Sequence, residues 1–141
     1  MWLFQTNSLL ILSAAFLMLH RVEGGRITAM GCFKDVRNNR ALPELLHSYR
    51  GDELNWGDLG GTVIEKCQEL AEKKKYKCFG IQFYGECWSG NDACNNFEIH
   101  GTADNCLCSG NGYKPYDPKR GYDCVEPVGG KLSNFVYEIE G

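Results

Sequence analysis

The stretch TVIEKCQELAEKKKYKCFGIQFY, residues 62–84, joins a helical pattern directly to a strand pattern and decides the fold class. Val63, Cys67 and Leu70 recur at helical spacing, and charged side chains fill the opposite face, so an amphipathic helix is predicted over 63–75. Thr62 followed by Glu65 fits a capping box at the start of this helix.

A strand pattern follows the helix without a linker. Phe79, Ile81 and Phe83 alternate with small or polar residues, which predicts a strand over 76–84. Working outward, we expect a first strand over 26–35 and a last strand over 134–139.

The segments between these elements are rich in turn residues. Residues 36–61 are expected to form a long ordered loop with a short helical turn at Glu44–Ser48, and residues 91–130 a second one with a turn at Asn111-Gly112. Residues 86–89 form a tight segment between two glycines. The predicted class is α+β: a small disulfide-rich domain, with one amphipathic helix packed on a small, mostly antiparallel sheet and long loops held by disulfides.

The N-terminal segment has the pattern of a secretion signal. An apolar run from Leu9 to Leu19 precedes Val22-Glu23-Gly24, which suits a cleavage site after residue 24. We therefore expect a signal peptide over 1–24, a single cysteine-rich domain over 25–141, and a secreted, extracellular protein. The apolar run is shorter than the roughly 20 residues of a membrane span, so no span is expected.

The charge balance limits the classes of partner. The formal net charge is −3, and the one dense basic cluster is Lys73-Lys74-Lys75 with Lys77. Nucleic acid binding requires a broad basic face, so no nucleic acid partner is expected. The oligomeric state is left open by the sequence.

Five pieces in a fixed order carry a resemblance to a known family. The chain resembles the WSC-type cysteine-rich extracellular module, a relative of PAN/apple domains, and is closest to secreted variants of marine invertebrates such as cnidarians. This resemblance implies one helix on a curled antiparallel sheet, and a carbohydrate-binding role. The pieces are Gly31-Cys32-Phe33-Lys34-Asp35, Arg40-Ala41-Leu42-Pro43, Cys67 within the helix, residues 79–90, and Asn134-Phe135-Val136-Tyr137.

The cysteines depart from the pattern of that family. The position two places after Cys87 is Ser89, where the module usually has a cysteine, and 106–124 looks like an added loop. Eight cysteines in an oxidising compartment are expected to pair, and they allow 105 pairings. The expected pairs are Cys67–Cys87, Cys32–Cys106, Cys78–Cys94 and Cys108–Cys124.

Trp88, with Tyr84 and Glu86, is the predicted ligand-binding group. An indole ring offers a broad face to the C–H face of a sugar, and the carboxylate supplies a polar partner. A packing role for Trp88, over a disulfide at the edge of the core, remains an open alternative. Trp56, Tyr113, Tyr116 and Tyr122 extend such a platform or pack in their loops, and the role of Arg50 in the 36–61 loop is also open.

Metal and catalytic chemistry find little support. A single residue separates Cys106 from Cys108, which does not suit zinc. The oxygen-rich set has only two carboxylates, too few for calcium: Asn91, Asp92, Asn95, Asn96 and Asp104. No nucleophile or metalloprotease motif occurs. We expect no metal, no cofactor and no enzymatic activity.

Three functions are consistent with these features. The first is a secreted, disulfide-stabilised binding module that recognises a glycan or glycoprotein without a covalent step. The alternatives are a structural protein of an extracellular or skeletal matrix, and a venom or defence component.

Overall fold

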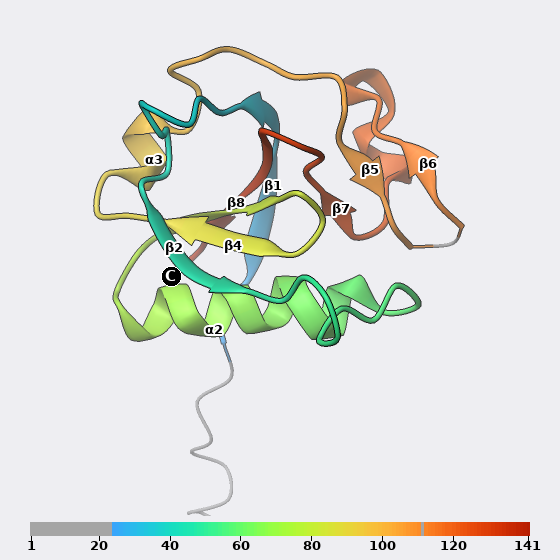
Figure 1. Ribbon diagram of the computed structural model, residues 1–141, viewed down its shortest axis with the longest axis horizontal. Coiled ribbons are helices and arrows are strands. Elements are labelled where there is room, and N and C mark those ends of the chain that lie inside the picture. Colours follow the sequence, from blue (N-terminus) through green and yellow to red (C-terminus); the bar gives the residue numbers. More distant parts are fainter. Residues whose placement is uncertain (1–23, 111) are drawn as a thin grey trace, which may run out of the picture.

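The computed structural model describes residues 24–110 and 112–141. The predicted signal peptide, apart from Gly24, lies outside these residues, as does Asn111 of the predicted turn. A five-stranded antiparallel sheet has the strand order β1-β8-β3-β4-β2, and a three-stranded antiparallel sheet has the order β6-β5-β7. Figure 1 shows the larger sheet above helix α2 and the smaller sheet to its right.

The large sheet is built from strands that lie far apart in the sequence. Its strands are β1 (Ile27–Lys34), β2 (Glu44–Ser48), β3 (Cys78–Gln82), β4 (Glu86–Ser89) and β8 (Ser133–Ile139). The small sheet contains β5 (Leu107–Cys108), β6 (Lys114–Pro115) and β7 (Pro127–Val128). The helical segments are η1 (Gly60–Ile64), α2 (Glu65–Lys73), α3 (Ala93–Asn96) and η2 (Pro118–Asp123). The expected α+β disulfide-rich class is thereby confirmed.

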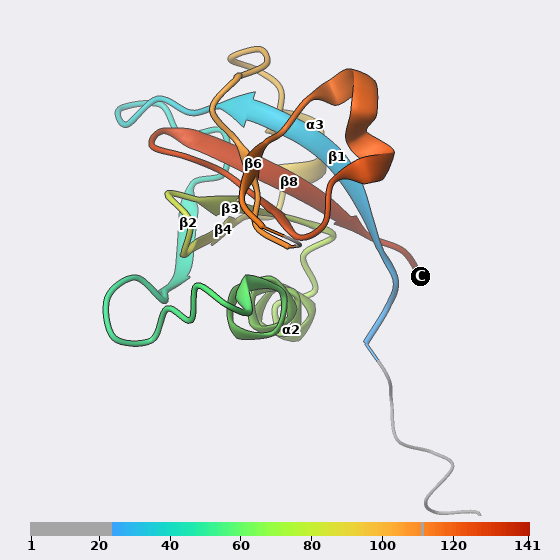
Figure 2. The ribbon, with the colours of Figure 1, turned by 90° about the vertical axis from the view of Figure 1, so that its right-hand side faces the viewer.

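The main hydrophobic core lies between α2 and one face of the large sheet. Figure 2, which looks along α2, shows the helix packed beneath the strands. Val63, Cys67 and Ala71 of the helical segment are fully buried against Phe79 and Phe135 of the sheet. The apolar spacing expected from the sequence therefore faces the core.

A second core covers the opposite face of the sheet. Phe33, Leu42, Cys78, Ala93, Phe97 and Val136 form this cluster. Because β3 is the middle strand of five and is covered on both faces, all five of its residues are buried. Alternate side chains of β3 therefore point into two different cores, and neither face of the strand is turned to solvent.

Four disulfides tie the layers and loops together, and no free cysteine occurs in the described residues. Cys67–Cys87 joins α2 to β4, and Cys78–Cys94 joins β3 to α3. Cys32–Cys106 joins β1 to the start of the small sheet, and Cys108–Cys124 joins β5 to the end of η2. These are the four pairs expected from the sequence.

One local expectation was wrong. Glu44–Ser48 is not a helical turn but strand β2, because it pairs with β4, with a bulge between Leu45 and His47. The tight segment 86–89 is strand β4, which pairs with both β2 and β3.

The predicted capping box is also absent. Helical turns begin earlier, at Gly60, and the hydroxyl of Thr62 donates to the carbonyl of Asp58 at 2.6 Å instead of accepting from an amide. The carboxylate of Asp58 accepts from the amide of Gly61 at 3.0 Å, so it satisfies one of the unpaired donors at this end of the helix.

The helix ends two residues before the expected position. Lys75 has a φ of 61°, and the amides of Lys75 and Tyr76 donate to the carbonyls of Glu72 and Ala71. This pair of bonds is a Schellman motif, which places a left-handed residue just past the helix and turns the chain towards β3.

Candidate functional site

The predicted ligand residues lie on and beside strand β4, but the structure brings only two of them together. Trp88 and Glu86 are two residues apart, on the same face of β4, and the indole Nε1–H donates to Glu86 Oε1 at 3.3 Å. The guanidinium carbon of Arg40 lies 4.1 Å from the centre of the Trp88 ring, within cation–π range. Trp88 is half-buried, because its indole also packs against the second core.

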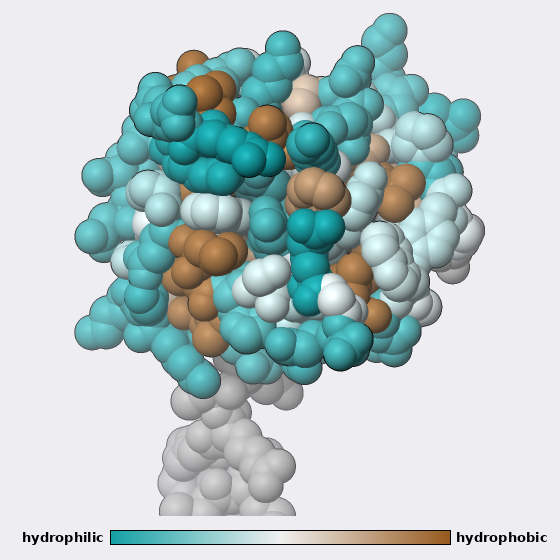
Figure 3. Space-filling view, in the orientation of Figure 1, coloured by the Kyte–Doolittle hydropathy of each residue, from teal (hydrophilic) through white to brown (hydrophobic). Residues whose placement is uncertain are grey.

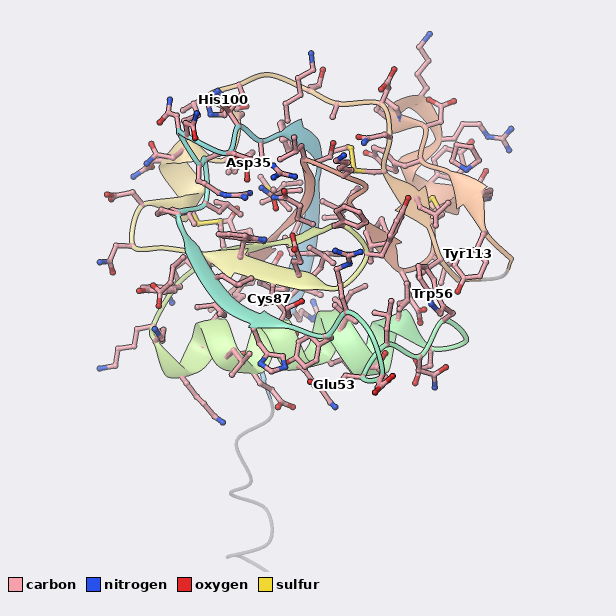
Figure 4. All side chains as sticks on the ribbon, viewed as in Figure 1. Asp35, Glu53, Trp56, Cys87, His100 and Tyr113 are labelled. Atoms are coloured by element: carbon pink, nitrogen blue, oxygen red, sulfur yellow. A yellow bond between two sulfur atoms is a disulfide. The ribbon has the colours of Figure 1, made fainter. Side chains whose placement is uncertain are left out.

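Tyr84 lies in a different environment. It packs against the main core, and its ring contacts Trp56 at 5.4 Å between centroids. Trp56 in turn contacts Tyr113 at 6.1 Å, and Figure 4 shows these two side chains next to each other on one side of the molecule. Tyr84 therefore belongs to an aromatic cluster with Trp56 and Tyr113, not to the neighbourhood of Trp88.

The other aromatic candidates are dispersed. Tyr116 packs edge-on against Phe135 at 5.0 Å, whereas Tyr122 is 83% exposed. The structure does not assemble one continuous aromatic platform from these residues.

A polar pocket opens next to Glu86, with a volume of about 200 Å³. We call it the arginine pocket, and its charged lining residues are Arg37, Arg40, Arg50, Lys131 and Glu86. Phe83, Gln82 and Leu132 complete the lining. Figure 3 shows strongly hydrophilic side chains gathered on the face of the molecule that carries β2 and β4. Four cations therefore line one small pocket together with a single carboxylate.

A buried network forms the base of the arginine pocket. The Asp35 side chain is fully buried, and its Oδ2 accepts from Arg40 at 2.8 Å and from Gln82 Nε2 at 2.8 Å. Its Oδ1 accepts from the amides of Val36 and Ala41 at 3.0 and 2.9 Å. Gln82 Oε1 also accepts from Arg40 at 3.1 Å. Arg40 is thus fixed by two side chains as well as by the Trp88 ring.

The turn between β3 and β4 forms the next part of the wall. Phe83 and Tyr84 have φ angles of 49° and 67°, which bulky side chains rarely adopt. Their amides donate to the carbonyls of Gly130 and Gly129 at 2.9 Å, and these bonds hold the turn. A Cβ on Gly129 would lie 1.9 Å from the Ser133 carbonyl oxygen, so the approach of these segments requires glycine.

Arg50 packs against a side chain of this turn. Its guanidinium carbon lies 3.6 Å above the centre of the Phe83 ring. The amide of Tyr49, the preceding residue, donates to the carbonyl of Gly85 at 2.8 Å. The backbone therefore fixes where Arg50 leaves the chain, and the ring fixes where its charge lies.

Another cavity, with a volume of about 500 Å³, lies between β1 and the segment 102–104. Met30, Phe33, Ala103 and Tyr116 give it a mainly apolar lining, with Lys34 and Asp104 as its charged residues. It contains none of the three predicted ligand residues.

The described residues offer little for metal or acid–base chemistry. Within residues 24–110 and 112–141, no cluster of three or more histidine, cysteine or acidic side chains is positioned to hold a metal ion. His47 contacts Glu53 at 3.1 Å on the surface. Hydrogen bonds from Lys74 and Tyr76 lower the pKa of Glu44, which marks it as a paired surface carboxylate. No helix in the described part of the chain has the length and apolarity needed to cross a bilayer.

The sequence did not point to most of the arginine pocket. Arg50 was noted with an open role, whereas Arg37, Arg40 and Lys131 were not considered as ligand contacts. They are scattered over 95 positions of the sequence, from 37 to 131, and only the pairing of β8 with β3 brings the last of them near the others. The predicted strand over 76–84 included Phe83 and Tyr84, whereas β3 ends at Gln82 and these two residues form the turn to β4.

Comparison with known proteins gives no family: no family model and no curated protein matches this chain. The resemblance to WSC-type modules therefore stays an expectation.

Proposed function

We propose that this protein is an extracellular binding module that recognises carbohydrate without a covalent step. Four disulfides suggest a secreted or extracellular protein, because such bonds persist in oxidising compartments. Disulfides and two small cores also provide a rigid support for surface groups, as a recognition site requires.

The observation that carries this proposal is the arginine pocket beside Trp88. Sugar recognition uses hydrogen-bonding groups next to an apolar ring face, and here Glu86 and the arginines lie beside the rings of Trp88 and Phe83. Glu86 accepts from sugar hydroxyls, and the guanidinium groups donate to hydroxyl and ring oxygens.

Tyr84 is not part of the proposed contact surface. Its ring packs against Trp56 and the main core, and Phe83 takes the place in the pocket wall that the sequence suggested for Tyr84.

The test is a broad glycan array probed with the oxidised chain Gly25–Gly141 and with Trp88→Ala and Glu86→Gln. We expect binding to a coherent set of glycans, lost in Trp88→Ala and weakened in Glu86→Gln. Near-ultraviolet circular dichroism and a thiol assay establish that each variant is folded and oxidised. Because Trp88 packs partly against the second core, Glu86→Gln keeps the test decisive if Trp88→Ala does not fold.

Trp56→Ala is the matched comparison, since it removes an exposed indole from the separate aromatic cluster. Binding lost in Trp56→Ala but retained in Trp88→Ala would move the site to that cluster and contradict the assignment. Absence of binding to any glycan by the folded wild-type protein would reject the carbohydrate proposal and leave the matrix and defence functions as the leading alternatives.

A further inference from the structure

We propose that the arginine pocket binds an anionic oxygen group, a sulfate or carboxylate carried by an extracellular polysaccharide. This inference rests on the proposed function and specifies its ligand class.

The first argument is the charge of the pocket. Arg37, Arg50 and Lys131 come from three separate segments of the chain and line one pocket of about 200 Å³. Within the part of the chain that the structure describes, none of them forms an ion pair with a carboxylate. Mutual repulsion of three such cations is unfavourable, and an anion bound among them relieves it. The whole chain has a net charge of −3, so this concentration of positive charge is a local feature and not a general property of the surface.

The second argument is the charge that the pocket already contains. The charge of Arg40 is balanced by the buried Asp35 carboxylate. One oxygen of Glu86 already accepts a hydrogen bond from the Trp88 indole. Counting Arg37, Arg40, Arg50 and Lys131 against Glu86 and Asp35 leaves an excess of two positive charges. That excess suits a sulfate monoester or a carboxylate and does not suit a neutral group.

The third argument is the fixed geometry of two guanidinium groups. Arg40 is held by Asp35 and Gln82, and its plane lies near the Trp88 ring. Arg50 lies over the Phe83 ring. A guanidinium supported in this way keeps its outer N–H groups free to form paired bonds to an oxyanion, and it loses little further freedom on binding.

The strained turn supports the same conclusion. Glycine or asparagine would adopt the left-handed conformation of residue 83 at lower cost than phenylalanine does. The Phe83 ring packs against the Arg50 guanidinium. This contact gives a reason for phenylalanine at a left-handed position, which the folding of the turn does not provide.

The dimensions of the site favour a polysaccharide over other polyanions. The pocket is small, at about 200 Å³, whereas nucleic acid needs a broad basic face. Phe83 lines the pocket and Trp88 contacts Arg40 of its lining, and both side chains are half-buried, so they provide surface for the sugar ring that carries the anion.

The experiment compares dextran sulfate with unmodified dextran, which have the same backbone, by calorimetric titration of the oxidised chain Gly25–Gly141. We expect dextran sulfate to bind and dextran to bind at least ~10-fold more weakly, and the affinity for dextran sulfate to fall as salt is raised from 0.1 to 0.3 M. Alginate, a uronic acid polymer, distinguishes carboxylate from sulfate. Inorganic sulfate alone shows whether the anion suffices without the sugar.

Variants locate the anion. Arg50→Gln and Arg37→Gln are each expected to weaken binding of dextran sulfate by ~10-fold, since each removes charge-assisted hydrogen bonds. Arg120→Gln is the matched control: it removes one exposed arginine that is paired with Asp123 outside the arginine pocket, and should change affinity less than ~2-fold.

Three results overturn this inference. Equal loss of affinity in Arg120→Gln would show a diffuse charge effect. Equal affinity for duplex DNA or for phosphatidylserine vesicles would show that the site does not select a polysaccharide. Binding to neutral glycans with no preference for sulfated or acidic ones would reject the anion while leaving the proposed carbohydrate function standing.

Discussion

Replacement of Arg40 by methionine is expected to destabilise the protein by roughly 2–4 kcal/mol. Methionine keeps much of the contact with Trp88 but leaves the buried Asp35 carboxylate with three uncharged donors. The loss of a hydrogen bond to a charged group costs about 1.5–3 kcal/mol. The loss of the cation–π contact adds about 0.5–1 kcal/mol. The value stays below that of breaking a fully buried ion pair because the Arg40 side chain is 22% exposed.

The assay is urea unfolding followed by tryptophan fluorescence, without reductant so that the disulfides stay closed. Arg37→Met is the matched control, since Arg37 is exposed and forms no ion pair within the described residues, and a change within about 0.5 kcal/mol is expected. A double-mutant cycle with Asp35→Asn isolates the pair, and we expect a coupling energy of about 1.5–3 kcal/mol. A cost below about 1 kcal/mol for Arg40→Met, or a coupling energy near zero, would show that the network does not hold Arg40 in place.

Three other predictions concern the fold. Lys75→Gly should stabilise the protein by about 0.5–1 kcal/mol in urea unfolding, because residue 75 is left-handed, and a lower stability would contradict the Schellman assignment. Gly129→Ala should destabilise severely or prevent folding, since its Cβ would lie 1.9 Å from a carbonyl oxygen, whereas Gly57→Ala, whose Cβ approaches only Asn55 Oδ1 at 3.4 Å, should fold normally by circular dichroism. Burial raises the pKa of Tyr137 well above 10.0, so this phenol stabilises the fold fully below pH 10 and less as pH rises further. Tyr137→Phe should therefore lose less stability than wild type between pH 10 and 12. Identical pH profiles of stability for the two proteins would refute the role of this phenol.

Much of the fold was accessible from the sequence because its signals are local. The helix could be located from the spacing of Val63, Cys67 and Leu70, and strands β3 and β8 from the alternation of large apolar side chains. The boundaries were less accurate. The carboxylate at the start of the helix is that of Asp58, four residues before the expected Thr62, and the left-handed residue is Lys75, where glycine is usual.

Strand β2 shows where local signals fail. Its sequence, Glu44–Ser48, has no strong strand pattern, and it is extended because β4 offers it hydrogen-bond partners. A contact of this kind depends on a residue 40 positions away, so no window around β2 contains the information.

The candidate site depended on tertiary structure even more. Trp88 and Glu86 were chosen for their side-chain chemistry. The structure places them on one face of β4 because residues two apart in a strand point to the same side. Tyr84 was grouped with them from its place in the sequence, whereas its ring lies against Trp56 after the left-handed turn at Phe83 and Tyr84. Arg37, Arg50 and Lys131 meet only after the sheet has formed.

The sequence by itself therefore determined the class of the domain, its helix, its main strands and the chemistry of its cysteines, because periodicity and cysteine content act over short distances. Only the tertiary structure decided which side chains share a pocket. The antiparallel pairing of β8 with β3 and the turn after β3 place distant cations around one small pocket, and that arrangement is a property of the folded sheet and not of any single segment.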